Sequence, residues 1–184
     1  MLHLACVASI ILLLQSTPVK TTPLAASDTI PHFPQVNGSS LTRQKFWLPA
    51  DFEGEFNIVL IAFKRKQQAD VDSWTPHLRP LTADHPGLRI YELPVLSRTL
   101  TIMRGFIDGG MRGGIPDSAV RAATITLYID KTPFKRVLAI RNEDSIEVVL
   151  VDRAGTIHWR FTGIFDETAL GELTNVLAAI KGRT

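Results

Sequence analysis

The sequence predicts an α/β domain of the thioredoxin-like class, with a central mixed sheet and helices on both faces. Two short apolar runs at 56–63 and 146–151 are rich in β-branched residues and are typical of buried central strands. Apolar side chains recur at helical spacing over 71–81 and 166–181. Strand, helix, strand, helix, strand pair and helix follow one another, which combines a parallel βαβ unit with an antiparallel ββα unit, the plan of the thioredoxin fold.

The strand pair near the C-terminus is the clearest single signal. Asp152–Gly155 has turn chemistry, and Gly155 is free to take a positive φ. Beyond the turn, apolar and polar side chains alternate from 157 to 162. This alternation predicts that Trp159 faces the core, as we also expect for Trp74, and that His158 faces solvent.

The other elements follow in order. A short strand at Lys45–Leu48 precedes the first central strand, and the following helix can be capped by Asp70 or Asp72. Pro80 is expected to kink or end that helix. We then expect, in chain order, a strand at 88–93, a helix at 99–111 with Leu100, Met103 and Ile107 on one stripe, a strand at 123–129, a turn at 130–133 and a returning strand at 137–140. Residues 115–140 form a strand-containing insertion before the C-terminal hairpin.

The N-terminus has the composition of a targeting segment. Leu4–Leu14 is an apolar run too short to span a bilayer, and small residues precede Ser27. We therefore expect residues 1–26 to be a signal peptide or N-terminal anchor of an exported, periplasmic or membrane-associated protein. The alternative is a wrongly assigned start codon and a buried N-terminal helix. Residues 27–44, rich in Pro, Ser and Thr, are expected to be a linker, and 45–184 the domain.

Composition excludes several function classes. The formal net charge of +2 is too small for nucleic-acid binding by charge alone. The only cysteine is Cys6, in the apolar N-terminal run, so the domain has no disulfide, thiolate metal site or cysteine nucleophile. His77 and His85 are separated by Pro80 and do not form a metal pair, and no GxSxG nucleophile motif is present. We expect no cofactor and no metal.

Redox-active proteins of the thioredoxin class carry two cysteines where the first central strand meets its helix. Here that position falls within Lys64–Ser73, which contains no sulfur. The turn before the hairpin usually carries a cis-proline, but Asn142–Ser145 contains no proline. Thiol–disulfide oxidoreductase activity is therefore not expected.

Several segments resemble the mitochondrial ATP synthase assembly-factor family. They are Gly110–Arg112, Arg121–Asp130 and Val149–Gly155 with Trp159-Arg160, and the similarity extends over about Phe46–Leu177. The resemblance implies a thioredoxin-like, non-catalytic protein that acts on a membrane subunit of the proton channel. The N-terminus differs from that of the family's mitochondrial members, so the chain would be a distant bacterial-type member whose client is left open.

The helix at 99–111 carries the first candidate site. Gly105, Gly109 and Gly113 are spaced by four and share one helix face. Such glycines can form a groove for a client's transmembrane helix, or let the helix pack closely on its own sheet, which we favour. Nearby arginines either hold the insertion on the core or contact carboxylates of a partner. The candidate partner-binding residues are Arg104, Gly105, Gly109, Met111, Arg112 and Arg121.

A second candidate is the basic run Lys64-Arg65-Lys66, which can bind phosphate, lipid headgroups or an acidic partner near a helix N-terminus. The simpler interpretation is a solvated strand end.

Three function hypotheses remain open. The first is a non-catalytic binding or assembly module, a chaperone for a membrane-protein complex. The second is an exported enzyme with a non-cysteine site at 64–72, and the third is a purely structural domain without a site.

Overall fold

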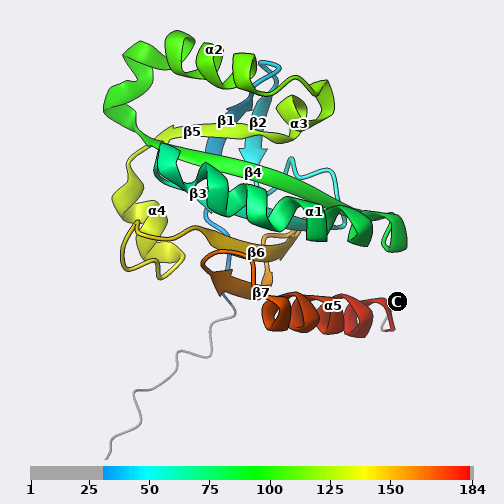
Figure 1. Cartoon of the computed structure of the whole chain (residues 1–184). Coiled ribbons are helices and arrows are strands. Elements are labelled where there is room, and N and C mark those ends of the chain that lie inside the picture. Colours follow the sequence, from blue (N-terminus) through cyan, green and yellow to red (C-terminus); the bar gives the residue numbers. More distant parts are fainter. Residues whose placement is uncertain (1–30, 183–184) are drawn as a thin grey trace, which may run out of the picture.

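The computed structural model describes residues 31–182 and contains one seven-stranded sheet in the order β2-β1-β5-β4-β3-β6-β7 (Figure 1). The expectations for residues 1–26 lie outside the described residues. The strands are β1 (Val36–Ser40), β2 (Lys45–Leu48), β3 (Phe56–Ala62), β4 (Leu88–Ser97), β5 (Ile125–Ile129), β6 (Glu147–Asp152) and β7 (Ile157–Thr162). The helices are η1 (Arg65–Gln67), α1 (Gln68–Asp84), η2 (Arg98–Met103), α2 (Arg104–Gly114), α3 (Ser118–Ala123), α4 (Lys131–Val137) and α5 (Glu167–Lys181). No helix in this described part is long and apolar enough to cross a bilayer.

The centre of the sheet has the predicted connectivity. β3 pairs in parallel with β4, and α1 makes the crossover between them. β6 pairs antiparallel with β3 and with β7, and α5 follows. The insertion adds β5, which lies parallel to β4 and joins the N-terminal hairpin β1–β2 to the sheet.

Two hydrophobic clusters fill the two faces of the sheet. One joins α1 and α5 to the sheet through Trp74, Leu78 and Leu173, and the other lies under α4 and includes Phe134 and Phe33. Trp74 is fully buried and Trp159 is 9% exposed, which confirms the prediction that both belong to the core. No residue from 98 to 114 belongs to either cluster, so η2 and α2 lie outside the hydrophobic interior.

The predicted linker is wrong over residues 31–44, because this stretch is part of the domain. Phe33 and Leu41 are each 1% exposed, and β1 lies between β2 and β5. The glycine in β1 has a packing role. A Cβ at Gly38 would lie 2.6 Å from side-chain atoms of Ile125 and Leu127. Glycine at position 38 leaves room for these two side chains.

Pro80 does not end its helix, one of the two outcomes expected for it. α1 continues to Asp84 through Pro76 and Pro80. Both prolines lie on the exposed side of the helix, where water can solvate the carbonyls that lose their partners, while Trp74 and Leu78 are buried on the other side.

The predicted returning strand at 137–140 is also absent. Asp130 accepts a hydrogen bond from the Thr132 backbone N–H at 2.9 Å and so caps α4. The segment read as a turn is therefore a helix start, and Phe134 and Leu138, four residues apart, are both buried.

Candidate functional site

The most unusual surface lies on η2 and α2. Ile102 is 93% exposed, Phe106 80% and Met103 48%. Ile102 and Phe106 are four residues apart and therefore lie along one side of the helical segment, next to a set of glycines. We call this set the α2 surface: Ile102, Met103, Phe106, Gly105, Gly109, Gly110 and Gly113.

The glycines of α2 do not pack on the sheet. A Cβ added at Gly105, Gly110 or Gly113 would meet nothing within 4 Å, and one at Gly109 would meet only the Arg112 side chain, at 3.9 Å. The favoured interpretation, close packing of this helix on its own sheet, is therefore wrong. The predicted stripe of Leu100, Met103 and Ile107 is not a core face either, since none of the three is buried.

The side of α2 that faces the sheet is polar. Asp108 is the only buried residue of α2, at 7% exposure. Its carboxylate accepts hydrogen bonds from the Tyr128 hydroxyl at 2.9 Å and from Arg104 Nε at 3.4 Å. Arg104 also donates to Ser39 Oγ, and its guanidinium lies 4.9 Å from the centre of the Tyr128 ring. Burial, followed by the hydrogen bond to Asp108, raises the pKa of Tyr128, so its hydroxyl stays protonated.

The other predicted arginines also make contacts within the chain. Arg112 donates to the Leu41 carbonyl at 3.3 Å, and Arg121 donates to the carbonyls of Ile115 and Pro116 at 2.7 and 2.8 Å. Met111 is half-buried. Of the two interpretations of the arginines, the geometry favours the one in which they hold the insertion against the core.

These contacts give the helix an inverted polarity. Arg104 and Asp108 are paired on the side of α2 that faces the sheet, whereas Phe106 of α2 and Ile102 and Met103 of η2 are exposed. A single exposed apolar residue is ordinary, whereas several that gather on one segment are a candidate interaction surface. Sequence reasoning missed Ile102 and Phe106; their spacing of four in line with Gly110 was the available signal.

Gln67 lies within Lys64–Ser73, the stretch where the sequence comparison with redox-active folds expects the two cysteines, and is 1% exposed. Its Oε1 accepts hydrogen bonds from the backbone N–H groups of Phe63 and Lys64 at 2.8 and 3.0 Å. Its Nε2 donates to the Glu143 carbonyl at 3.0 Å. Gln67 thus joins the strand end to the loop before β6, and the predicted capping by Asp70 or Asp72 is wrong because the helical turns begin before them.

Ion pairs surround this glutamine. Lys64 binds Asp144 at 3.0 Å, and Glu143 binds both Lys131 and Lys135, at 2.9 and 2.8 Å. Burial alone would raise the pKa of Glu143, but the hydrogen bonds from the two lysines lower it overall. Of the predicted anion site, Lys64 is therefore already paired.

Arg65 and Lys66 of that site are exposed to solvent on the first turn. They line neither the cavity beside Leu88 and Leu177 nor the one beside Arg141 and Arg160. The geometry favours the simpler interpretation of Lys64-Arg65-Lys66 as a solvated strand end.

Glu92 is a carboxyl near the start of α1 whose pKa is raised. Burial raises its pKa, the Asp72 charge raises it further, and a hydrogen bond from Gln68 opposes the shift. Glu92 lies on β4, opposite Leu60 of β3. The hypothesis of a non-cysteine enzyme site requires a polar pocket at 64–72 with a perturbed acid or base, and Glu92 lies outside that stretch, so the hypothesis stays untested.

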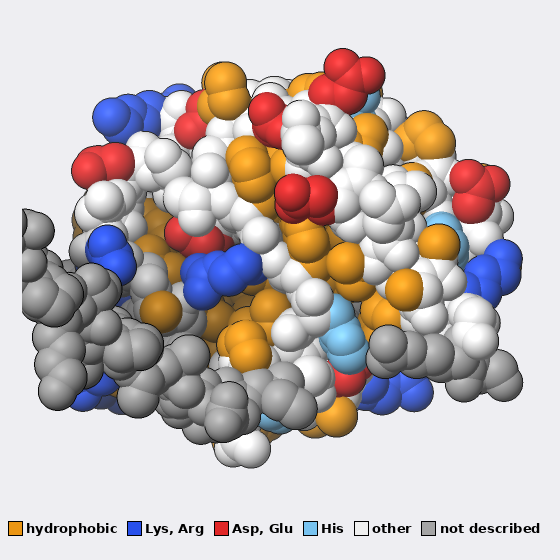
Figure 2. Space-filling model, turned by 90° about the horizontal axis from the view of Figure 1, so that it is seen from below, with side chains coloured by type: hydrophobic (Ala, Val, Ile, Leu, Met, Phe, Trp, Pro, Cys, Tyr) orange, Lys and Arg blue, Asp and Glu red, His pale blue; other side chains and the backbone are white. Residues whose placement is uncertain are grey.

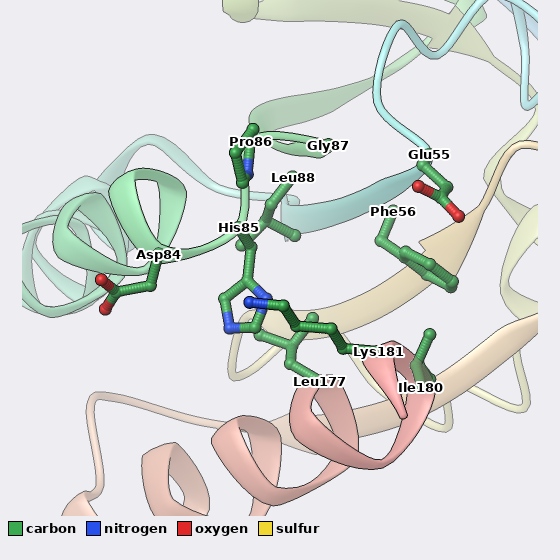
Figure 3. Close-up of a pocket in the computed structure, with 10 residues that line it drawn as sticks. All are labelled: Glu55, Phe56, Asp84, His85, Pro86, Gly87, Leu88, Leu177, Ile180 and Lys181. Carbon is green, nitrogen blue, oxygen red and sulfur yellow. The ribbon is translucent and has the colours of Figure 1, made fainter. Parts of the chain in front are cut away.

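An apolar cavity of about 210 Å³ lies at the start of the parallel strands β3 and β4 (Figure 3). Leu88, Leu177 and Phe56 contribute apolar side chains, while Asp84 and Lys181 are at its rim.

No group of three or more His, Cys, Asp or Glu side chains that could hold a metal ion occurs within residues 31–182. On the face seen in Figure 2, basic and acidic side chains are interspersed with hydrophobic ones.

No family model matches the chain, and no curated protein matches it. Solved structures do. The thioredoxin domain of a thiol-disulfide oxidoreductase from Bacteroides vulgatus is 19% identical with a TM-score of 0.54, covering 80% of this chain and 95% of that one. A SCO1/SenC family lipoprotein from Bacillus anthracis str. Ames is 10% identical with a TM-score of 0.54, covering 81% and 95%. A thioredoxin-like protein from Porphyromonas gingivalis is 14% identical with a TM-score of 0.52, covering 84% and 95%.

These similarities establish the fold. The chain has a thioredoxin-like α/β fold, as its sequence predicts.

Proposed function

We propose that this protein is a redox-inactive thioredoxin-like module that binds an apolar helix of a membrane-protein partner on the α2 surface. The proposal rests on one observation: Asp108 of α2 is buried and paired, while Phe106 of α2 and Ile102 of η2 are exposed. Burial of a phenylalanine or isoleucine side chain is worth about 1.5–3 kcal/mol. A partner that covers these side chains therefore gains the free energy of burying apolar surface that is exposed to water in the isolated domain.

The glycines give the class of partner. Small residues at a spacing of four let a second helix approach the backbone closely, as helices do when they associate in membranes. Glycine costs about 1 kcal/mol at each helical position, and at these positions no contact within the described residues requires it. The resemblance to the ATP synthase assembly-factor family points in the same direction, toward a membrane subunit held during assembly of a complex.

An exported location supports this role. The apolar run Leu4–Leu14 would place the domain beside a membrane, as a signal peptide or an anchor. One of the structural neighbours is described as a lipoprotein. We propose a periplasmic or membrane-associated protein without thiol–disulfide oxidoreductase activity, because Lys64–Ser73 contains no cysteine.

Site-specific photocrosslinking in native cells tests the proposal. A benzophenone side chain at position 106 should give an adduct with a membrane protein, and the crosslink should map to an apolar helix of that partner. The same side chain at Ile164, which is 62% exposed but lies outside the α2 surface, is the matched control and should give no such adduct. Gly109→Leu, which fills the open glycine face, should abolish the adduct at position 106.

Thermal unfolding of the Gly109→Leu variant distinguishes a blocked surface from a misfolded one. Because nothing but the Arg112 side chain lies near a Cβ at position 109, the variant should remain folded. Equal crosslinking at positions 106 and 164, or an adduct that persists in the folded Gly109→Leu variant, would rule out the α2 surface as the docking site.

A further inference from the structure

We propose that a polar cavity at the start of β6 and the end of β7 binds the carboxylate or phosphate group of a small molecule. The cavity has a volume of about 290 Å³. Its polar lining residues are Arg141, Asn142, Ser145, Glu147, Arg160 and Thr162. They come from the loop between α4 and β6 and from the two strands of the C-terminal hairpin, so α2 contributes nothing to this site.

A buried carboxylate organises one side of the cavity. Glu147 is 5% exposed and accepts hydrogen bonds from Arg160 Nη2 and from Thr162 Oγ1, each at 2.9 Å. Arg160 also donates from Nη1 to the Leu138 carbonyl at 2.8 Å. Glu147 is therefore already paired, and it fixes Arg160 in one orientation beside the cavity.

The lining groups that have no partner within the chain are mainly hydrogen-bond donors. Within residues 31–182, the Arg141 guanidinium and the Ser145 hydroxyl have no hydrogen-bond partner closer than 3.5 Å. The Oδ1 atom of Asn142 accepts a hydrogen bond from the Asp144 backbone N–H at 3.0 Å, which leaves its amide N–H groups as donors. A cavity that offers donors and has its only carboxylate paired favours an anion.

Charge points to the same ligand class. Arg141 and Arg160 together carry two positive charges against one negative charge on Glu147, which leaves a net charge of +1 in the lining. Arginine binds carboxylate and phosphate groups through two parallel hydrogen bonds. The volume lies just below the range of about 300–1,000 Å³ typical of sites for drug-sized ligands, and so fits a small molecule.

The site is distinct from the basic run Lys64-Arg65-Lys66 considered from the sequence. The loop Asn142–Ser145 separates them: Asp144 pairs with Lys64 on one side, while Asn142 and Ser145 line the cavity on the other. This loop stands where redox-active relatives usually carry a cis-proline, so in this chain the same loop would position an anion.

NMR titration of the ¹⁵N-labelled full chain tests the proposal with inorganic phosphate, acetate and succinate as probes and sodium chloride at matched ionic strength as the reference. Saturable shifts are expected at the backbone amides of Asn142, Ser145 and Thr162 in at least one probe. Stronger binding of phosphate assigns the site to phosphate-bearing ligands, and stronger binding of acetate or succinate assigns it to carboxylates.

Arg141→Gln should weaken binding by at least about tenfold, the loss expected for one charge-assisted hydrogen-bonded pair. Arg79→Gln is the matched control, because Arg79 is an exposed arginine on α1 that does not line the cavity. It should change the affinity by less than about twofold, as is typical of distant surface charges. Shifts that do not saturate, or equal losses in the two variants, would overturn the site.

Discussion

Tyr128 on β5 donates its hydroxyl hydrogen to Asp108 on α2 at a distance of 2.9 Å. Asp108 is the only buried residue of α2, so this hydrogen bond, together with the contacts of Arg104 with Ser39 and the Tyr128 ring, attaches the helix to the sheet. In a polar attachment of this kind, removing one partner leaves the other buried without a hydrogen bond, and the loss of stability includes the cost of desolvating that group.

Asp108→Ala should therefore destabilise the protein by about 1–3 kcal/mol, since it leaves the Tyr128 hydroxyl without its acceptor and Arg104 without its ionic partner. Tyr128→Phe, which removes one donor and leaves Arg104 paired, should cost less, about 1 kcal/mol. Chemical denaturation monitored by tryptophan fluorescence measures both. If Asp108→Ala is no more destabilising than Tyr128→Phe, the carboxylate does not hold the helix.

Gly109→Ala and Gly113→Ala should each stabilise the isolated protein by about 0.5–1 kcal/mol. Alanine lowers the conformational entropy of the unfolded chain, and the added Cβ at position 113 meets nothing within 4 Å. The melting temperature measured by circular dichroism should therefore rise in both variants. Gly38→Ala is the contrasting variant, because its Cβ would clash with Ile125 and Leu127; it should lower the melting temperature.

Gln67→Leu should destabilise the protein by about 1–3 kcal/mol. The change keeps the size of the side chain but leaves the buried N–H groups of Phe63 and Lys64 without their acceptor. Urea unfolding gives the difference in free energy. Gln44→Leu is the control at an exposed position in the β1–β2 turn and should change stability by less than about 0.5 kcal/mol.

Glu92→Gln should stabilise the protein at neutral pH. Because burial raises the pKa of Glu92, the folded state binds its proton more tightly than the unfolded state, and stability falls as pH rises from the ordinary value of 4.5 through the folded pKa. The variant lacks this loss. Its advantage in unfolding free energy should be absent at about pH 4 and present at about pH 7. An advantage that is equal at the two values would contradict the raised pKa.

The sequence was sufficient to predict the central sheet, because the strands at 56–62 and 147–152 and the helices α1 and α5 carry strong periodic patterns. It was insufficient where the local signal was ambiguous. Asp130–Pro133 is compatible with both a turn and a capped helix start, and only the burial of Phe134 and Leu138 decides between them. β1 has almost no hydrophobic residues, and its place in the sheet depends on contacts with β5 that are distant in sequence.

The candidate site was predicted only in part. The glycines and arginines of α2 were identified, but not which of them face inward, because helical spacing alone does not say which side of a helix meets the sheet. Arg104, Arg112 and Arg121 make internal contacts, whereas Ile102 and Phe106 are exposed. The cavity beside Arg141 and Arg160 could not be predicted, since its residues come from segments that only the tertiary structure brings together.

The absence of residues 98–114 from both hydrophobic clusters has an evolutionary consequence. Substitutions on the outer side of this segment leave the interior unchanged and carry little folding penalty. The outer surface of this segment can therefore diverge between descendants of this protein while the scaffold beneath stays the same.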